Sequence, residues 1–148
     1  MYFRKEYAFL STFYPSPIVF LGQTCPTAEH LYQALKAEKW EDAVKIMHAP
    51  TPGMAKKMGR EVVMRKDWED VKLEMMHMVI KQKFLQNPDL AEKLINLPDE
   101  EIIENNYWGD TFWGICGGKG HNHLGKILMK VRLYLRQLNQ SRTNNSEQ

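Results

Sequence analysis

The sequence is poor in the features that mark several classes of protein. Two cysteines, Cys25 and Cys116, are too few for a disulfide framework and lack the spacing of a metal-binding cluster, so we expect reduced thiols. No apolar run approaches the length of a membrane-spanning helix, and the charges in MYFRKEYAFL are too early and too frequent for a signal peptide. The formal net charge of +2 does not predict the broad basic surface of a dedicated nucleic-acid binder. Together these absences predict a soluble cytoplasmic protein that has no membrane partner.

The chain also lacks internal repeats and linkers, so its 148 residues predict a single domain. We expect this domain to span residues 1–138, because residues 139–148 contain no apolar side chain and are typical of a disordered tail. Residues 2–27 are rich in aromatic and β-branched side chains but are interrupted by prolines and Gly22. That composition predicts short strands and turns.

Helices are expected in most of the remaining chain. Each of four predicted helices begins at a residue that can cap it, in two cases followed by a first-turn proline: Thr27, Thr51 with Pro52, Asp67, and Asn87 with Pro88. Apolar residues from Leu124 to Leu138 form one stripe of a closing helix, whose basic side is most simply a solvated surface. Residues 101–105 predict a brief strand. The fold class is therefore α+β, a helix-rich single domain with a small β element near its N-terminus.

The helix predicted over residues 28–40 has two contrasting faces. At about 100° per residue, an acid, an amide, a base and an indole share one face: Glu29, Gln33, Lys36 and Trp40. The opposite face is apolar. A solvated face with Glu29 at the positive end of the helix is one interpretation; a half-covered cleft is the other. Trp40 favours the cleft, because an indole gains little among exposed charges.

Residues 107–126, YWGDTFWGICGGKGHNHLGK, concentrate six of the nine glycines and two of the four tryptophans. The glycines at 117, 118 and 120 permit positive φ and close approach to a ligand. Trp108 or Trp113 could stack on a base or sugar beside Asp110, and Asn122 could cap the last helix or, with loop amides, hold a phosphate. A glycine-rich turn with tryptophans packed in the core is the structural alternative, and it stays open.

Two further motifs in this segment are weak. GHNHLGK matches the start of a phosphate-binding P-loop, but Ile127 stands where Ser or Thr must hold magnesium, so we reject that motif. His121 and His123 lack further ligands nearby in the sequence, and we predict no metal site. A nucleophilic pair of Cys116 and His30 has no specific support.

Several segments resemble the motifs of one family in the expected order. PTAEHLYQALK, DTFWG and GKGHNHLGKILMKVR are similar to characteristic segments of the NADAR family of YbiA-like proteins, as are FLSTFYPSPI, MGREVVMRKDWEDVK and KFLQNP. The resemblance runs from about Tyr7 to Arg136. It implies a helix-rich α+β fold and hydrolysis of N-glycosidic bonds to ribose, without a cofactor. In that family the substrates are phosphorylated riboflavin-biosynthesis intermediates or ADP-ribosylated guanine in nucleic acid.

The resemblance also implies site residues. The helix motif supplies Glu29, His30, Gln33 and Lys36; the later motifs supply Asp110, Trp113, Gly114 and Asn122; the front motif supplies Phe13 and Tyr14. Thr12 stands where asparagine is usual, and Ile115-Cys116 stand where some members have Asp-Gly. These departures leave the hydrogen bonding of the ligand and the choice of substrate open.

Cleavage of a bond between ribose C1′ and nitrogen builds positive charge on the sugar, which calls for a nearby carboxylate and a positioned water. We expect Glu29 to be the chief catalytic carboxylate and Asp110 the second, with Lys36 beside Glu29. The other residues would bind a phosphorylated N-riboside of the type of 5-amino-6-ribosylaminouracil phosphate. Two alternatives are a glycohydrolase that removes ADP-ribose from guanine in nucleic acid and a non-catalytic module that binds ADP-ribose or another NAD-derived nucleotide.

Overall fold

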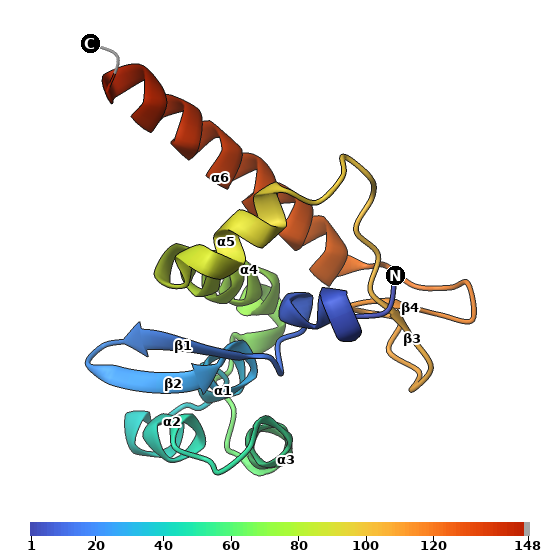
Figure 1. Ribbon diagram of the computed structural model, residues 1–148. Coiled ribbons are helices and arrows are strands. Elements are labelled where there is room, and N and C mark those ends of the chain that lie inside the picture. Colours follow the sequence, from blue (N-terminus) through green and yellow to red (C-terminus); the bar gives the residue numbers. More distant parts are fainter. Residues whose placement is uncertain (147–148) are drawn as a thin grey trace.

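The computed structural model describes residues 1–146 and shows a helix-rich α+β fold, which confirms the predicted class (Figure 1). Its elements in chain order are the 3-10 helix η1 (Lys5–Leu10), strands β1 (Pro15–Phe20) and β2 (Gln23–Thr27), helices α1 (Ala28–Ala34), α2 (Trp40–Met47), α3 (Pro52–Glu61), α4 (Trp68–Gln86) and α5 (Pro88–Ile95), strands β3 (Asn105–Asn106) and β4 (Ile115–Cys116), and helix α6 (His123–Ser146). No helix within this range is both long and apolar enough to cross a membrane.

The predicted β element is an antiparallel hairpin of β1 and β2. Ile18 pairs with Cys25, and both side chains are fully buried. Leu21 and Gly22 form the two-residue turn with φ of 47° and 80°, the left-handed conformation that such hairpins require. The hairpin leads directly into α1, where the Thr27 hydroxyl accepts a hydrogen bond from the His30 N–H, as predicted.

Helix α1 is central and shorter than predicted. All seven of its residues are buried, and it packs against β1, β2, α2, α3 and α4. It ends at Ala34 because the next residues pair with the segment after α3: Ala37 bridges to Met64, and the Arg65 N–H donates to the Lys36 carbonyl. Tertiary backbone pairing thus overrides local helix propensity. The prediction that Trp40 shares a helical face with Glu29 is wrong, because Trp40 begins α2.

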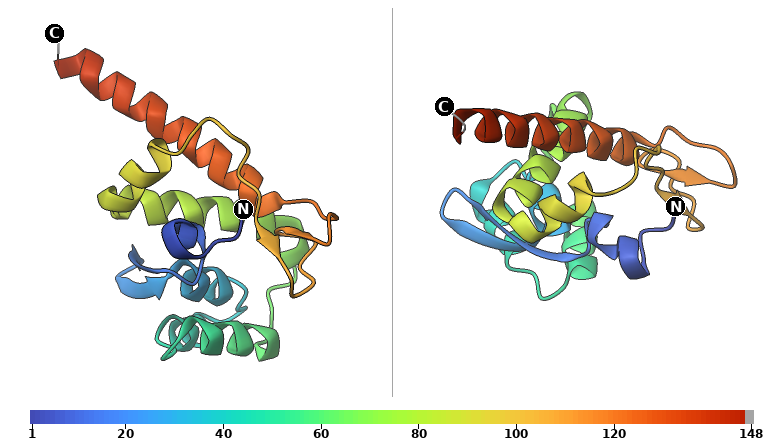
Figure 2. Two further views of the ribbon diagram at one scale, coloured as in Figure 1. Left: turned by 45° about the vertical axis from the view of Figure 1, so that its right-hand side comes forward. Right: turned by 45° about the horizontal axis from the view of Figure 1, so that its top comes forward.

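Helix α6 packs against α4 and α5 and then extends beyond the body of the protein (Figure 2). The sequence predicted a disordered tail after residue 138, but the helix continues to Ser146. Residues 139–145 are exposed, and none of them is a glycine or proline that would end the helix. Residues 147–148, also part of the predicted tail, lie outside the described residues.

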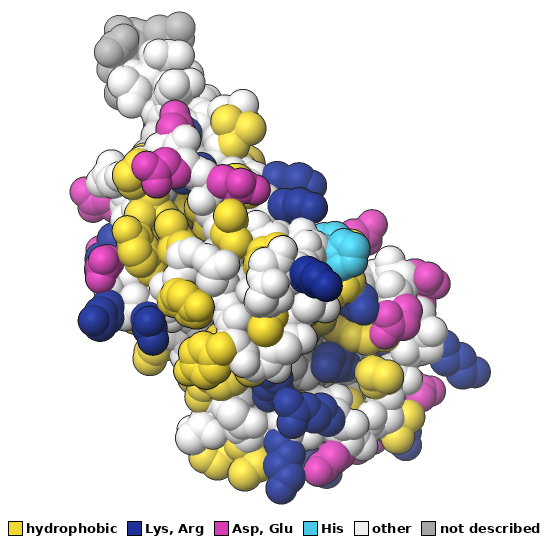
Figure 3. All heavy atoms as spheres, turned by 90° about the vertical axis from the view of Figure 1, so that its right-hand side faces the viewer, with side chains coloured by type: hydrophobic (Ala, Val, Ile, Leu, Met, Phe, Trp, Pro, Cys, Tyr) yellow, Lys and Arg dark blue, Asp and Glu magenta, His cyan; other side chains and the backbone are white. Residues whose placement is uncertain are grey.

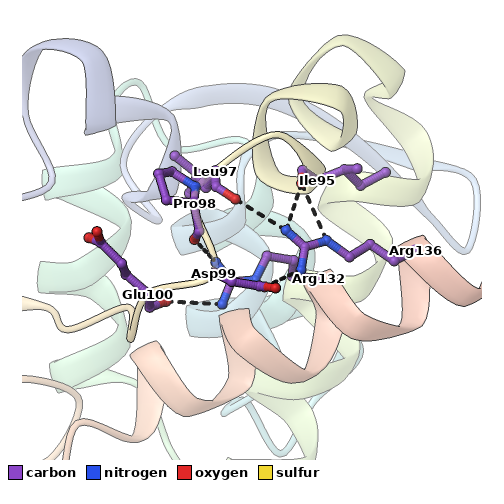
Figure 4. Close-up of polar contacts among 7 residues, drawn as sticks. All are labelled: Ile95, Leu97, Pro98, Asp99, Glu100, Arg132 and Arg136. Carbon is purple, nitrogen blue, oxygen red and sulfur yellow. Dashed lines mark hydrogen bonds and ion pairs between the residues drawn. The ribbon is translucent and has the colours of Figure 1, made fainter.

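Two arginines on α6 anchor the irregular segment that follows α5 (Figure 4). Arg132, only 7% exposed, donates to the carbonyls of Pro98 and Glu100, and Arg136 donates to those of Ile95 and Leu97. The basic side of α6 is therefore only partly a solvated surface, as two of its cations hold the chain just before Glu104.

Candidate active site

One cavity of about 530 Å³ brings together distant parts of the sequence. Its walls come from the loop after η1, from α1 and α3, and from residues 104–113. Figure 3 shows the face on which β3 and β4 lie, where basic and acidic side chains gather close to one another. The side chains that could act on a ligand are three acids, two cations and four aromatic rings: Glu29, Glu104, Asp110, Lys56, Arg60, Phe13, Tyr32, Trp108 and Trp113.

Glu29 lies in the first turn of α1, is 6% exposed and lines the cavity. Its two oxygens are held separately: Oε2 accepts from the Thr12 hydroxyl at 2.7 Å and Oε1 accepts from Gln33 Nε2 at 2.7 Å. Gln33 itself is buried and is not among the cavity-lining residues. Thr12, the position at which the family usually has asparagine, thus orients the carboxylate, and Gln33 does so from one helical turn away.

Asp110 is fixed by a turn of its own. Its Oδ1 accepts from the N–H groups of Phe112 and Trp113 at 3.1 and 2.9 Å, while the Asn106 side chain bonds to both the N–H and the carbonyl of Asp110. These bonds place the acid and the Trp113 ring on the same cavity wall. Only Oδ1 takes part in them, so Oδ2 is left to accept from a water or a ribose hydroxyl.

Glu104 is a third cavity acid, which was not predicted from the sequence. Its Oε2 is buried and has no hydrogen-bond partner among the described residues. Burial, and then Asp110 and Glu29, raise the pKa of Glu104 from 4.5 to about 7, against an opposing effect of Lys56. No motif marks this residue, since it reaches the cavity only because the segment after α5 is held against α6.

Two residues predicted to bind substrate instead hold Glu104. Asn122 is buried, accepts from the Glu104 N–H through Oδ1 and donates to the Ile102 carbonyl through Nδ2. Gly114 leaves room for the acid, because a Cβ there would lie 2.4 Å from Glu104 Oε2. Asn122 has a φ of 52°, and its side chain makes these two hydrogen bonds instead of capping α6.

A group of cations lies near the acids. Lys56 and Arg60 lie one turn apart on α3 and line the cavity, a spacing of four residues that was available in the sequence as a signal. Lys36 follows α1, with its ammonium 5.7 Å from the centroid of the Tyr32 ring. Burial lowers the pKa of Lys36; Glu29 opposes this effect, and Arg60, Lys56 and Lys72 add to it. Lys36 lies just beyond the end of α1 and is not among the cavity-lining residues, so its predicted role beside Glu29 stays a prediction.

The aromatic rings offer flat surfaces beside these charges. Trp113 is partly buried against the core and meets Tyr32 edge to face at 5.6 Å, so it serves both the fold and the cavity. Phe13 is 40% exposed and Trp108 is 58% exposed, and both line the cavity.

The remaining predicted residues lie elsewhere. His30 is 1% exposed, and its ring nitrogens contact the Thr27 hydroxyl at 2.8 Å and the Ala49 carbonyl at 3.0 Å, so its partners are structural. Tyr14 packs against the core and does not line the cavity. The glycines at 117, 118 and 120 do have positive φ, as predicted, but the turn that they form does not line the cavity. In residues 1–146, no group of three or more His, Cys, Asp or Glu side chains is arranged to hold a metal ion.

Comparison with known proteins places this architecture in a family. The NADAR domain matches residues 1–136. An N-glycosidase of Nostoc punctiforme is 39% identical over 148 residues, covering 93% of this chain and 94% of its own. The N-glycosidase YbiA of Escherichia coli is 36% identical over 132 residues, covering 86% and 81%.

Two further comparisons agree with this. A riboflavin biosynthesis protein of Vibrio vulnificus is 39% identical over 131 residues, which are 86% of this chain but only 35% of that longer protein. The solved structure of Escherichia coli YbiA superimposes with a TM-score of 0.83 at 33% identity, covering 94% of this chain and 86% of that one. The chain therefore belongs to the NADAR family.

Proposed function

We propose that this protein hydrolyses the bond between ribose and a nitrogen heterocycle in phosphorylated N-ribosides, of the type of the riboflavin intermediate 5-amino-6-ribosylaminouracil phosphate. The observation that carries the proposal is that the oriented carboxylate of Glu29 lines the same cavity as Trp113 and the two cations of α3. Relatives named N-glycosidases over most of the chain support the coarser assignment, a hydrolase acting on N-glycosyl compounds.

The acids suit the sugar end of such a substrate. As the C1′–N bond breaks, positive charge grows on the ribose, and a carboxylate beside C1′ stabilises it or accepts a proton from the attacking water. Glu29 is suited to this role because Thr12 and Gln33 fix both of its oxygens before substrate arrives. Asp110 has an oxygen left for the water or a ribose hydroxyl.

The cations and rings suit the other two parts of the substrate. Lys56 and Arg60 line the cavity without a carboxylate partner in residues 1–146, so they are available to a phosphate. Trp113 and Phe13 provide faces on which a heterocycle can stack. Phosphate, ribose and base would thus each meet the chemistry that recognises them.

The test is Glu29→Gln, with Glu61→Gln as a matched control because Glu61 is exposed at the end of α3. We expect Glu29→Gln to lower kcat by roughly 10²- to 10⁴-fold on the phosphorylated aminopyrimidine riboside, while Glu61→Gln keeps the wild-type rate. A folded Glu29→Gln variant that turns over normally would remove Glu29 from catalysis.

A second candidate is removal of ADP-ribose from guanine in nucleic acid. Tyr107 and Trp108, 76% and 58% exposed and in edge-to-face contact at 5.3 Å, favour a ligand larger than a mononucleotide. Incubation of the protein with the riboflavin intermediate and with ADP-ribosylated guanine oligonucleotide, side by side, distinguishes the two substrates. Binding without cleavage of either would instead indicate a non-catalytic nucleotide-binding module.

A further inference from the structure

We propose that Glu104 is the general acid of this site, donating a proton to the departing base while Glu29 acts on the sugar. This inference rests on the proposed N-glycosidase function and adds a catalytic residue that no motif identifies. Two carboxyl groups that line one cavity then act at the two ends of the scissile bond, Glu29 at the sugar and Glu104 at the base.

The hydrogen bonding of the two acids separates their roles. Both oxygens of Glu29 already accept from protein donors. Glu104, in contrast, has a buried Oε2 with no partner in residues 1–146, although it lines the cavity. Negative charge on a buried oxygen without a donor is unfavourable, so the unpaired Oε2 favours the protonated form of this carboxyl group. A protonated carboxyl group in this position has a donor to offer to a basic atom of the ligand.

The backbone around Glu104 is fixed on two sides. Its N–H donates to Asn122 Oδ1 at 2.9 Å, and its carbonyl accepts from the Ile115 N–H at 2.8 Å. Gly114 packs against the carboxyl group without a side chain, so even a methyl group there would displace it. Such support is what a proton donor needs, because proton transfer depends on a held distance to the accepting atom.

Burial and the charges that face Glu104 keep part of this carboxyl group protonated near neutral pH. Asp110 and Glu29 disfavour a further negative charge, while Lys56 on α3 acts in the opposite direction, and burial is the largest effect. The pKa of Glu104 is therefore about 7, and the acid form is well populated below that pH. Arg60 lines the same cavity from α3.

Protonation of the base and addition of water at C1′ together complete the cleavage. The Glu104 proton passes to a ring or exocyclic heteroatom of the base, and the electron pair of the C1′–N bond leaves with the base. Water adds to C1′ and gives up one proton to Glu29. The products are ribose phosphate and neutral base, and solvent returns a proton to Glu104 and removes one from Glu29.

The experiment compares two substrates that differ in their need for an acid. One is the phosphorylated aminopyrimidine N-riboside; the other is 4-nitrophenyl β-D-ribofuranoside 5-phosphate, whose phenolate leaves without protonation. We expect Glu104→Gln to lower kcat/KM for the N-riboside roughly 10²- to 10⁴-fold and to change that of the nitrophenyl substrate only a few-fold. Glu101→Gln, an exposed acid in the same segment, is the control and should leave both rates unchanged.

The wild-type enzyme gives a second measurement, which decides the matter if Glu104→Gln does not fold. Cleavage of the N-riboside should decline above about pH 7, and cleavage of the nitrophenyl substrate should not. Identical pH profiles, or equal losses on both substrates in a folded Glu104→Gln variant, overturn the assignment of Glu104 and leave the N-glycosidase proposal intact. Wild-type protein that cleaves neither substrate overturns both.

Discussion

For the substitution Gly59→Ala, helix propensity and packing predict changes in stability of opposite sign. Gly59 lies in α3 and packs directly on Gln33 of α1. In an open helix, glycine to alanine stabilises by roughly 1 kcal/mol. Here a Cβ would lie 1.9 Å from Gln33 Oε1 and 2.8 Å from Cδ, so the amide must move.

The cost of this movement exceeds the gain. Overpacking of a buried position costs about 1–3 kcal/mol, and loss of the bond from Gln33 Nε2 leaves Glu29 Oε1 without its protein donor, which costs a further ~1–3 kcal/mol. After subtraction of the propensity gain, we expect Gly59→Ala to destabilise the protein by roughly 1–5 kcal/mol. Because Glu29 loses an orienting contact, we also expect kcat to fall.

Urea unfolding followed by tryptophan fluorescence measures this change as a shift in midpoint at constant m. Gly53→Ala is the control in the same helix, since the nearest atom to its added Cβ is Thr51 Oγ1 at 3.9 Å; it should be neutral or stabilising. Gln33→Ala should relieve much of the clash when combined with Gly59→Ala, giving a measurable coupling energy. If Gly59→Ala stabilises the protein as much as Gly53→Ala does, the packing of Gly59 on Gln33 of α1 is incorrect.

Three other substitutions probe the cavity and its support. Lys83→Met removes a fully buried amino group that donates to the carbonyls of Phe9 and Ser11. Burial lowers the pKa of Lys83 to about 7, so at pH 8 the group is mainly a neutral amine, and we expect its loss to cost about 1–3 kcal/mol in urea unfolding. Trp113→Ala should weaken ligand binding by roughly 1–3 kcal/mol in calorimetry, and unchanged affinity would exclude stacking on that ring. Glu104→Gln tests linkage: the folded pKa of about 7 lies above the reference 4.5, so wild-type stability should fall as pH rises between these values, by on the order of 3 kcal/mol over 2.5 units. The variant should lack that fall, and equal pH dependence in both proteins would contradict the raised pKa.

The parts of the fold that the sequence predicted are those set by local chemistry. Thr27 and Thr51 each precede a helix and each hydroxyl accepts from a backbone N–H in the first turn, as expected. Asp67 occupies the equivalent position before α4, yet its carboxylate pairs with Arg65 and makes no capping bond. Arg65 binds the Asp67 carboxylate in place of a backbone N–H of the first turn, and the residue pattern alone does not show which of these partners the acid takes.

The sequence likewise predicted only part of the candidate site. The family motifs identified Glu29, Asp110 and Trp113, which do line one cavity. The same motifs did not separate residues that face the cavity from those that support it, because His30 is one position from Glu29 on the same helix yet contacts the Ala49 carbonyl. Glu104 carried no local signal at all, since its environment is produced by contacts with Asn122 and Gly114.

The arrangement of charge in the cavity gives the proposed reaction a direction. The charged lining residues of helix α3 are both cations, Lys56 and Arg60, whereas those of residues 104–113 are both acids, Glu104 and Asp110. A phosphorylated riboside is itself polarised, with its negative charge at the phosphate and, as the bond breaks, its positive charge at C1′. On the proposed function, binding with the phosphate toward α3 satisfies both ends, and the reverse orientation sets phosphate against carboxylates. Electrostatics would then select the productive orientation before any contact with the base is made, so changes of the heterocycle should affect KM less than removal of the phosphate.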